Sequence, residues 1–180
     1  MVTGRHETRE RIVQAASELA WESGPGKLSL DAVAAKAGVS KGGLLYHFPS
    51  KAKLLEATVE TFVEDYDRLL KEREAAHAQA TTPVAQAFLD VFIDDVRCKR
   101  PPSSGILAAL AEDPSFLNPI KRYDRALLDR IKADLGDTGL AMILYFVISG
   151  LKCNELLSLN VVRQDEIDSL TERLRALISE

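Results

Sequence analysis

The stretch that decides the fold reads GVSKGGLLYHFPSK and spans residues 38–51. Ser40 can cap a short helix that runs through Phe48, because its hydroxyl can accept a hydrogen bond from a backbone amide of the first turn. The helix carries two adjacent glycines, Gly42 and Gly43, although each costs roughly 1 kcal/mol of helix propensity relative to alanine. Lysines lie at both ends of it. This composition indicates a helix whose backbone comes close to a large anionic partner.

Two predicted helices precede this stretch. The first extends from about Arg5 to Ser23, carries an apolar stripe, and stops where glycine and proline follow. The second starts after Ser29 and ends at Gly38, a residue type that readily takes the left-handed conformation. The tight AGVS corner at residues 37–40 is typical of a helix-turn-helix, whose second helix enters the major groove of DNA.

The short helix after this corner is therefore the candidate DNA reader. Its glycine pair lets the backbone approach DNA, and the amides at its start, together with Ser40, can donate to a phosphate. Close helix packing inside the head is the alternative reason for the pair. The nearby lysines suit phosphate contacts, which position a protein without reading sequence, or are simply solvated. The candidate DNA-binding residues are Arg5, Ser29, Ser40, Lys41, Gly42, Gly43, Leu44, Tyr46, His47, Lys51 and Lys53.

The charge of the chain is unevenly divided. The net charge is −4, yet residues 1–53 carry eight lysines and arginines against five acidic residues, and the rest carry fifteen against twenty-two. A basic N-terminal quarter on an acidic body is expected when one face meets a polyanion. The N-terminal GRHETR, which contains Arg5, can extend this face as an arm in the minor groove, or it can be frayed.

The rest of the chain has helical periodicity. A long fourth helix begins after Ser50, and each of Thr82-Pro83 and Asp113-Pro114 pairs a capping residue with a proline at the first helical position. Further helices are predicted near 83–98, 103–112, 114–134 and 138–158, with a ninth through Leu177. We predict an all-α chain of about nine helices, divided into a DNA-binding domain over residues 1–50 and a larger helical domain over residues 51–180.

No set of catalytic or metal-binding residues stands out. Cys98 and Cys153 lack metal-ligand spacing, and adjacent acidic residues such as Asp94 and Asp95 are typical of solvated helix faces. We therefore expect neither an enzyme nor a cofactor nor a metal site. The longest apolar run, residues 139–151, is shorter than the roughly 20 residues of a membrane span, and the N-terminus lacks the apolar run of a signal peptide. Both observations favour a cytoplasmic protein without a membrane segment.

The sequence RERIVQAASELAWESGPGKLSLDAVAAKAGVSKGGLLYHFPSKAKLLEA, residues 9–57, closely resembles the DNA-binding head of the TetR (tetracycline-repressor) family. The resemblance implies a homodimeric repressor with a C-terminal domain for ligand binding and dimerisation, whose operator binding is released by a small molecule. It implies a phosphate contact for Lys51 and groove contacts for residues 40–43 and His47. The family usually has a tyrosine where this chain has Leu45; Tyr46 lies one residue on, roughly 100° around the helix.

The eighth predicted helix, 138–158, is apolar almost all round from Leu140 to Leu151. In a soluble chain such a helix needs cover on both sides. We expect it to form, with the ninth helix, a four-helix interface between two copies of the chain; burial inside one large domain is the alternative. Two-fold symmetry would then match an inverted-repeat operator with half-sites ~34–36 Å apart. The candidate interface residues are Val147, Leu151, Leu170, Leu174 and Leu177.

Aromatic residues recur on the middle helices and can line an apolar ligand cavity or fill a solid core. The candidate pocket residues are Phe62, Tyr66, Phe88, Phe92, Leu110, Phe116, Tyr123, Tyr145 and Phe146. A pocket is implied mainly by the family resemblance, with an unidentified effector of apolar or aromatic character. Two other functions stay open at this point: a constitutive DNA-binding protein without an effector, and an all-α protein-interaction module.

Overall fold

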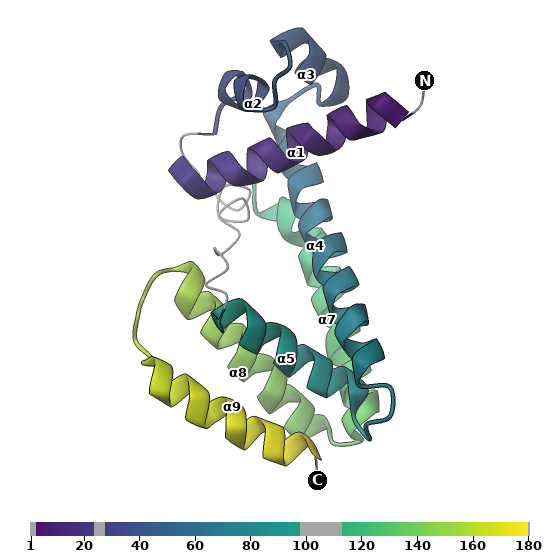
Figure 1. Cartoon of the computed structure of the whole chain (residues 1–180), viewed down its shortest axis with the longest axis vertical. Helices are drawn as coiled ribbons and strands as arrows, with labels where there is room; N and C mark the ends of the chain where they lie inside the picture. The colour runs from purple at the N-terminus through teal and green to yellow at the C-terminus, as the bar shows by residue number, and fades with distance from the viewer. Residues whose placement is uncertain (1–2, 24–27, 98–112, 180) are drawn as a thin grey trace. The chain divides into compact units, whose positions relative to one another are not determined.

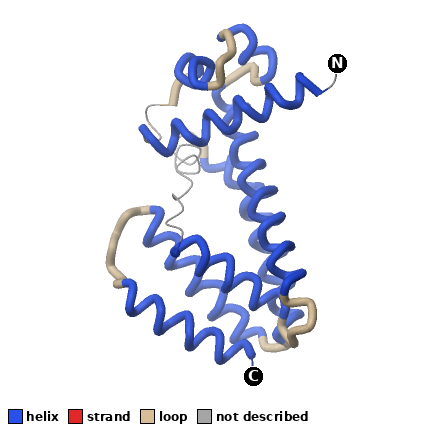
Figure 2. The backbone as a smooth tube through the Cα atoms, in the orientation of Figure 1, coloured by secondary structure: helices blue, strands red, loops and turns tan. Residues whose placement is uncertain are grey.

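The computed structural model describes residues 3–23, 28–97 and 113–179. Within these ranges the chain forms α-helices and one 3-10 turn, and no strand (Figure 1, Figure 2). This confirms the all-α class. The elements are α1 (Thr3–Ser23), α2 (Leu30–Lys36), α3 (Lys41–His47), α4 (Lys51–Ala76), α5 (Pro83–Arg97), η2 (Pro114–Leu117), α7 (Asn118–Leu135), α8 (Thr138–Leu156) and α9 (Gln164–Ser179).

The observed helices follow the predicted ones closely, with one difference in type. The helix predicted near 114–134 begins as the 3-10 turn η2, and continues as α7. The helix predicted near 103–112 lies outside the described residues, and so does the glycine-proline break after α1.

Short polar side chains begin several helices, as the sequence predicts. The hydroxyl oxygens of Ser29, Ser40 and Ser50 accept hydrogen bonds from backbone amides three residues later, at 3.2, 3.0 and 3.2 Å. Asp113 accepts from the Ser115 amide at 2.8 Å and so caps η2. These side chains satisfy amides that have no partner inside the helix.

Thr82 does not cap α5, contrary to the sequence-based prediction. Its hydroxyl donates instead to the carbonyl oxygen of Ile178 near the end of α9, at 2.6 Å. At the start of α5, the Ala85 amide donates instead to the carboxylate of Asp134 of α7, at 2.8 Å. Long-range contacts therefore replace the local cap at this helix.

Gly38 makes the corner between α2 and α3. Its φ of +66° lies in the left-handed region, which side chains with a Cβ rarely adopt. The Gly38 amide donates to the Ala35 carbonyl at 3.2 Å, and the Val39 amide donates to the Ala34 carbonyl at 3.0 Å. This pair of bonds is a Schellman motif, which ends α2 and turns the chain into α3.

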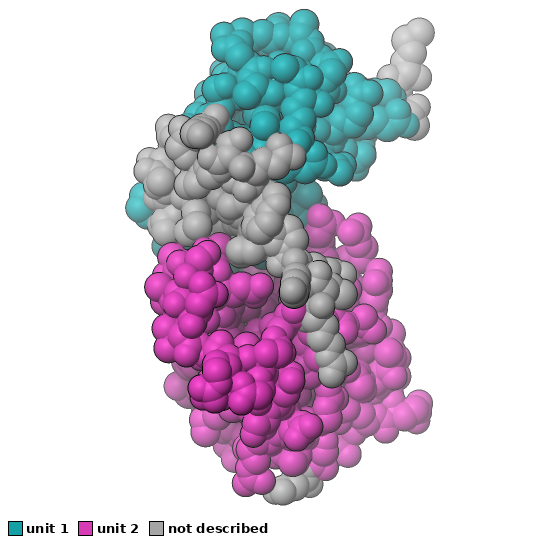
Figure 3. Space-filling view, turned by 60° about the vertical axis from the view of Figure 1, so that its left-hand side comes forward, with its two compact units in different colours: residues 1–64, 103–121 teal, residues 65–102, 122–180 magenta. Residues whose placement is uncertain are grey.

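The chain divides into two compact units (Figure 3). Unit 1 comprises residues 1–64 and 103–121, and unit 2 comprises residues 65–102 and 122–180. Helix α4 runs without a break through the boundary between Glu64 and Asp65. The division into functional domains of residues 1–50 and 51–180 stays a prediction, because the two compact units are defined by packing and not by function.

Unit 1 has its own apolar core. In it α1 packs against α2, and α2 against α3. Ile12 of α1, Val33 of α2 and Leu44 of α3 are all completely buried, and Phe48 is buried beside them. Leu44 and Phe48 thus hold α3 against this core, and the opposite face of α3 is exposed to solvent.

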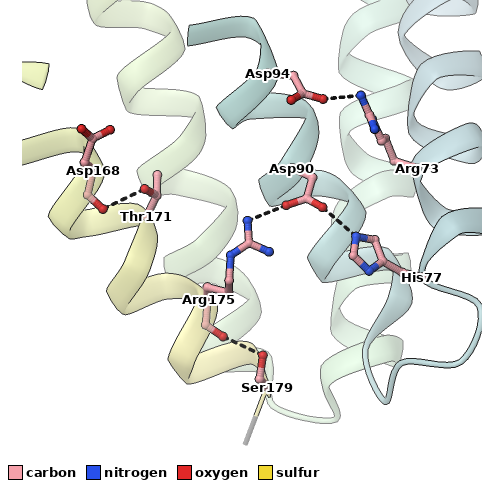
Figure 4. A network of polar contacts seen from close by, with 8 residues as sticks. All are labelled: Arg73, His77, Asp90, Asp94, Asp168, Thr171, Arg175 and Ser179. Carbon is pink, nitrogen blue, oxygen red and sulfur yellow. Dashed lines mark hydrogen bonds and ion pairs between the residues drawn. The ribbon is translucent and has the colours of Figure 1, made fainter. Parts of the chain in front are cut away.

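Unit 2 has a second core, built where α8 and α9 pack against α5. Beside this core lies a polar network centred on Asp90 of α5 (Figure 4). The Asp90 carboxylate accepts from Arg175 Nη2 of α9 at 2.6 Å, and lies 2.6 Å from Nε2 of His77. A neighbouring ion pair joins Arg73 of α4 to Asp94 of α5. The network therefore ties α9 and the segment after α4 to α5.

We expect Asp90→Asn to lower the free energy of unfolding by roughly 1–3 kcal/mol at pH 7, the usual range for hydrogen bonds to charged groups. Burial opposes ionisation of Asp90, but the hydrogen bonds from Arg175 and His77 outweigh it and lower the pKa of the carboxyl. A lowered folded pKa gives stability that is present above the unfolded pKa and is lost as pH falls through the folded one. Urea unfolding at pH 7 and in acid checks both effects.

Asp168→Asn is the matched control, because the exposed Asp168 side chain bonds only within α9, to Gln164 at 3.0 Å. It is expected to change stability by less than about 0.5 kcal/mol. Equal effects of the two substitutions at pH 7 would contradict the importance of the network around Asp90.

Candidate functional site

The candidate DNA-facing surface is the outer face of α3 with the residues that flank it. Leu44 and Phe48 hold α3 to the core of unit 1, so the orientation of the helix is fixed by packing. Lys41, Gly42, Leu45 and Tyr46 are exposed. Ser40 accepts from the Gly43 amide, and its own hydroxyl hydrogen can still be donated outward.

Packing inside the head restricts Gly43 but does not restrict Gly42. A Cβ atom added at Gly42 would meet no atom closer than the Ser40 Oγ at 4.0 Å. At Gly43 the added atom would lie 3.3 Å from the same oxygen, which is tight enough to disturb the cap. Gly42 therefore has space for a side chain among the described residues, and a close approach to DNA stays the predicted reason for its small size.

Two of the predicted DNA-contacting lysines already have carboxylate partners. Lys41 Nζ lies 3.0 Å from the Asp31 carboxylate of α2, and Lys53 Nζ lies 2.6 Å from that of Glu56. The hydrogen bond and the charge of Glu56 raise the pKa of Lys53. Exposed pairs of this kind are worth at most about 1 kcal/mol, so a phosphate can replace the carboxylate. Lys51 is the first residue of α4 and is half-buried.

Arg5 lies on a helix and not on an extended arm, because α1 already begins at Thr3. Its guanidinium carbon is 5.0 Å from the ring centre of Tyr46, and Tyr46 meets His47 edge-on with ring centres 5.3 Å apart. Arg5, Tyr46 and His47 thus form one group at the end of α3. Tyr46 is 66% exposed and is accessible to a partner.

Two predicted DNA contacts have other roles in the structure. Leu44 is completely buried in the core of unit 1, so its inclusion among the DNA-facing residues is wrong. The sequence predicted correctly that Leu44 lies on the reading helix, but it did not show that Leu44 is on the face that packs against the core. Ser29 is exposed, and its hydroxyl accepts from the Ala32 amide at the start of α2; a DNA contact for it stays a prediction.

Helix α8 carries an apolar face that the described part of the chain leaves exposed. Met142, Ile143 and Phe146 are 42%, 54% and 57% exposed, and Leu157 just after the helix is 56% exposed. The helix is long and apolar enough to cross a membrane by length and composition, with a mean hydropathy of 1.3, but helices of soluble proteins also meet this criterion. Most of this helix is therefore accessible among the described residues.

The predicted interface residues differ in how deeply they are buried. Val147, Leu151 and Leu170 are half-buried against the core of unit 2. Leu177 is half-buried on α9. Leu174 is only 2% exposed and belongs to that core, so it is not available at a surface. The sequence analysis missed Met142 and Ile143, although their spacing from Phe146 by four and three residues is a helical stripe.

The predicted pocket residues are divided between the units. Tyr66, Phe88, Phe92, Tyr123 and Tyr145 belong to the core of unit 2 or pack against it. Phe116 packs against the core of unit 1, and Phe62 lies in unit 1 as well. Phe146 is exposed on α8, and Leu110 lies outside the described residues. Only the unit 2 group forms one cluster.

This cluster contains a charged residue that the sequence analysis did not single out. Lys152 of α8 is half-buried, and its Nζ donates to the Tyr66 hydroxyl of α4 at 3.0 Å. Burial lowers the pKa of Lys152 to about 8. The cause of its burial is tertiary: Tyr66 and Lys152 are 86 positions apart in sequence, and no local pattern joins them.

Two family comparisons match this chain. Residues 12–58 match the family described as bacterial regulatory proteins, tetR family, and residues 82–179 match the one described as tetracyclin repressor-like, C-terminal domain. The second match covers more than half of the chain. Both are families of transcriptional regulators and not of enzymes, as the sequence predicts.

Individual transcriptional regulators also resemble this chain in sequence. The transcriptional regulator TtgR of Pseudomonas putida is 33% identical over 69 residues, which are 38% of this chain and 33% of TtgR. The transcriptional repressor Rv3405c of Mycobacterium tuberculosis is 33% identical over 90 residues, which are 50% of this chain and 45% of the repressor. The matches thus span a third to a half of these relatives.

A solved structure extends the likeness to nearly the whole chain. The multidrug binding protein EbrR, solved in complex with malachite green, superposes with a TM-score of 0.71 and 25% identity. The match covers 94% of this chain and 96% of EbrR.

Proposed function

Because the chain belongs to the TetR family of bacterial regulatory proteins, we propose that it is a homodimeric transcriptional repressor that binds an inverted-repeat operator and leaves it when a small molecule binds. The observation that carries this proposal is Gly42. This residue is exposed at the start of the reading helix, and no contact with the described residues requires it to be glycine.

The DNA-binding step rests on the outer face of α3. Backbone amides at its start, Lys41 and Tyr46 offer donors to phosphates and base edges. Few long polar side chains lie on this face, so backbone contacts and DNA shape carry much of the recognition. We assign the operator contacts to Ser40, Lys41, Gly42, Gly43, Tyr46, His47, Lys51 and Lys53, with Arg5 beside Tyr46.

The homodimer rests on the exposed apolar face of α8. Met142, Ile143 and Phe146 would pack against the same residues of a second copy, with Leu170 and Leu177 of α9 at the side. In a two-fold interface the same patch of each copy packs against that of the other. The exposed apolar side chains of α8 would thereby be buried. Such an interface also supplies the two reading helices that an inverted repeat needs.

The response to a ligand rests on unit 2 and on α4. Helix α4 is continuous from Lys51, beside the reading helix, to Ala76 in unit 2. A ligand that binds among the aromatic residues of unit 2 would shift α4 and change the spacing of the two reading helices. It releases the operator only if it binds the DNA-free arrangement more tightly. The likeness to EbrR supports a small-molecule ligand, and the regulatory role supports a cytoplasmic location.

Lys51→Ala is expected to weaken operator binding by about tenfold and to lower the slope of log K against log salt by about one unit, because one phosphate contact is lost. The measurement is a fluorescence anisotropy titration at several salt concentrations. The DNA is a duplex selected from a random pool by the wild-type chain. Lys71→Ala is the control, since Lys71 pairs with Asp67 in unit 2 and should leave both quantities unchanged.

If Lys51→Ala leaves affinity and slope as they are, the phosphate assignment of this lysine is wrong. If the wild-type chain selects no duplex at all, the proposed function itself fails. A constitutive regulator, the other possibility left by the sequence, would bind DNA yet show no release by any ligand.

A further inference from the structure

We infer that Asp31 and Glu56 restrain DNA binding, because each carboxylate holds a lysine for which the phosphates of a duplex must compete. Asp31 holds Lys41 of α3, and Glu56 holds Lys53 of α4. The inference rests on the proposed function, in which both lysines contact the operator. It adds two acidic residues that lower the affinity of the chain for any duplex.

The first ion pair joins the two helices of the helix-turn-helix. Asp31 lies in the first turn of α2, and Lys41 is the first residue of α3. The Nζ of Lys41 lies 3.0 Å from each of the two carboxylate oxygens of Asp31. The side chain of Lys41 is 57% exposed and that of Asp31 is 69% exposed. The ammonium that is proposed to meet a phosphate is therefore accessible, but a negative charge of the chain already holds it.

The second ion pair lies within the first turns of α4. The Nζ of Lys53 donates to the carboxylate of Glu56, three residues later, at 2.6 Å. This hydrogen bond, followed by the charge of Glu56, raises the pKa of Lys53, and the charge of Glu60 adds to the effect. Lys53, like Lys41, thus has a carboxylate partner in the DNA-free chain.

A phosphate can take either lysine only in exchange for its carboxylate. The exchange breaks one ion pair to form another, and it leaves a carboxylate without its cation beside the phosphates, where like charges repel. The freed carboxylate also attracts a salt cation, which partly offsets the cations that DNA releases when a lysine binds. The two carboxylates should therefore weaken DNA binding and make it depend less steeply on salt.

A purely structural role of these carboxylates predicts the opposite effect on affinity. Asp31 also stabilises the start of α2, because a negative charge is favourable at the N-terminal end of a helix. If the ion pair with Lys41 served only to hold the corner between α2 and α3, its loss would loosen the head and weaken DNA binding. A restraint predicts tighter binding, so the sign of the change separates the two roles.

The test measures DNA binding of the full-length variants Asp31→Asn and Glu56→Gln, and of the double variant, by fluorescence anisotropy at several salt concentrations. One duplex is the selected one and the other has a scrambled sequence. Each single variant should bind both duplexes about threefold more tightly at low salt, and the double variant about tenfold, as the strength of exposed ion pairs implies. The slope of log K against log salt should steepen by up to about one unit for each carboxylate removed. Unchanged or weaker binding would overturn the inference.

Glu18→Gln is the matched control, because it changes the charge of the same unit by the same amount. Glu18 of α1 pairs with Lys36 at the end of α2, at 3.3 Å, and neither residue is among the proposed operator contacts. This variant should bind both duplexes as the wild type does. A gain equal to that of Asp31→Asn would overturn the inference, since the net charge of the head would then set the affinity.

A double-mutant cycle tests whether Asp31 acts through Lys41. When Lys41→Met is already present, there is no ion pair to break, so Asp31→Asn should raise the affinity less than it does in the wild type. Equal gains in both backgrounds would overturn the restraint, because they would show that Asp31 repels the duplex directly. Failure of the wild-type chain to bind any duplex would instead count against the proposed function, so the two failures are distinguishable.

Discussion

Phe146→Asp converts the protein into monomers and lowers operator affinity by at least about 100-fold, because two linked reading helices gain that much over one. Phe146 is 57% exposed and meets the ring of the adjacent Tyr145 edge-on, so the substitution removes little internal packing. In a two-fold interface the same substitution occurs twice, and it places two carboxylates within an apolar contact. Sedimentation analysis gives the oligomeric state, and anisotropy with the selected duplex gives the affinity.

Ala133→Asp provides the matched control. Ala133 is an exposed residue of α7 in the same unit, and the new carboxylate there faces solvent. This variant should remain dimeric and should bind the duplex as the wild type does. A dimeric Phe146→Asp variant with unchanged affinity would show that the exposed face of α8 is not the interface.

Gly42→Asp abolishes operator binding, with a loss of at least about 100-fold, while the protein remains folded. The position has space for a side chain, and an acidic residue in the first turn of a helix is favourable by about 0.3–1 kcal/mol. Thermal unfolding should therefore occur at the wild-type temperature or slightly above it. The loss of affinity follows because the carboxylate meets the phosphates that this helix approaches.

Gly42→Ala separates size from charge at the same position. Alanine adds only the Cβ and raises helix propensity by roughly 1 kcal/mol, so the variant should be more stable than the wild type. We expect it to bind DNA about tenfold less tightly, because the backbone can no longer come as close to the duplex. If Gly42→Asp binds DNA within threefold of the wild type, Gly42 does not face the DNA.

Much of the architecture could be predicted from the sequence because its determinants are local. The helix caps at Ser29, Ser40 and Ser50 act over three residues, and Gly38 ends α2 through its own backbone conformation. Apolar periodicity, which needs only the neighbouring turns, located the long helices. The likeness of residues 9–57 to the TetR head is likewise confined to one continuous segment, and the family comparison confirms it.

The remaining features depend on residues far apart in the chain, and only the tertiary structure decided them. Packing against α1 and α2 turned Leu44 into the core and left Gly42 exposed. The contacts of Thr82 with Ile178 and of Asp134 with Ala85 replaced a predicted local cap.

The sequence by itself thus determined that the chain is all-helical and has a helix-turn-helix head, since hydrogen bonds and periodicity within single segments encode these properties. The resemblance of residues 9–57 indicated the TetR family. Only the tertiary structure showed which face of α8 is exposed. Only the tertiary structure showed that Lys152 contacts Tyr66. The physical reason is that the burial of a side chain, and hence its charge environment, depends on the helices that pack around it and not on its own helix.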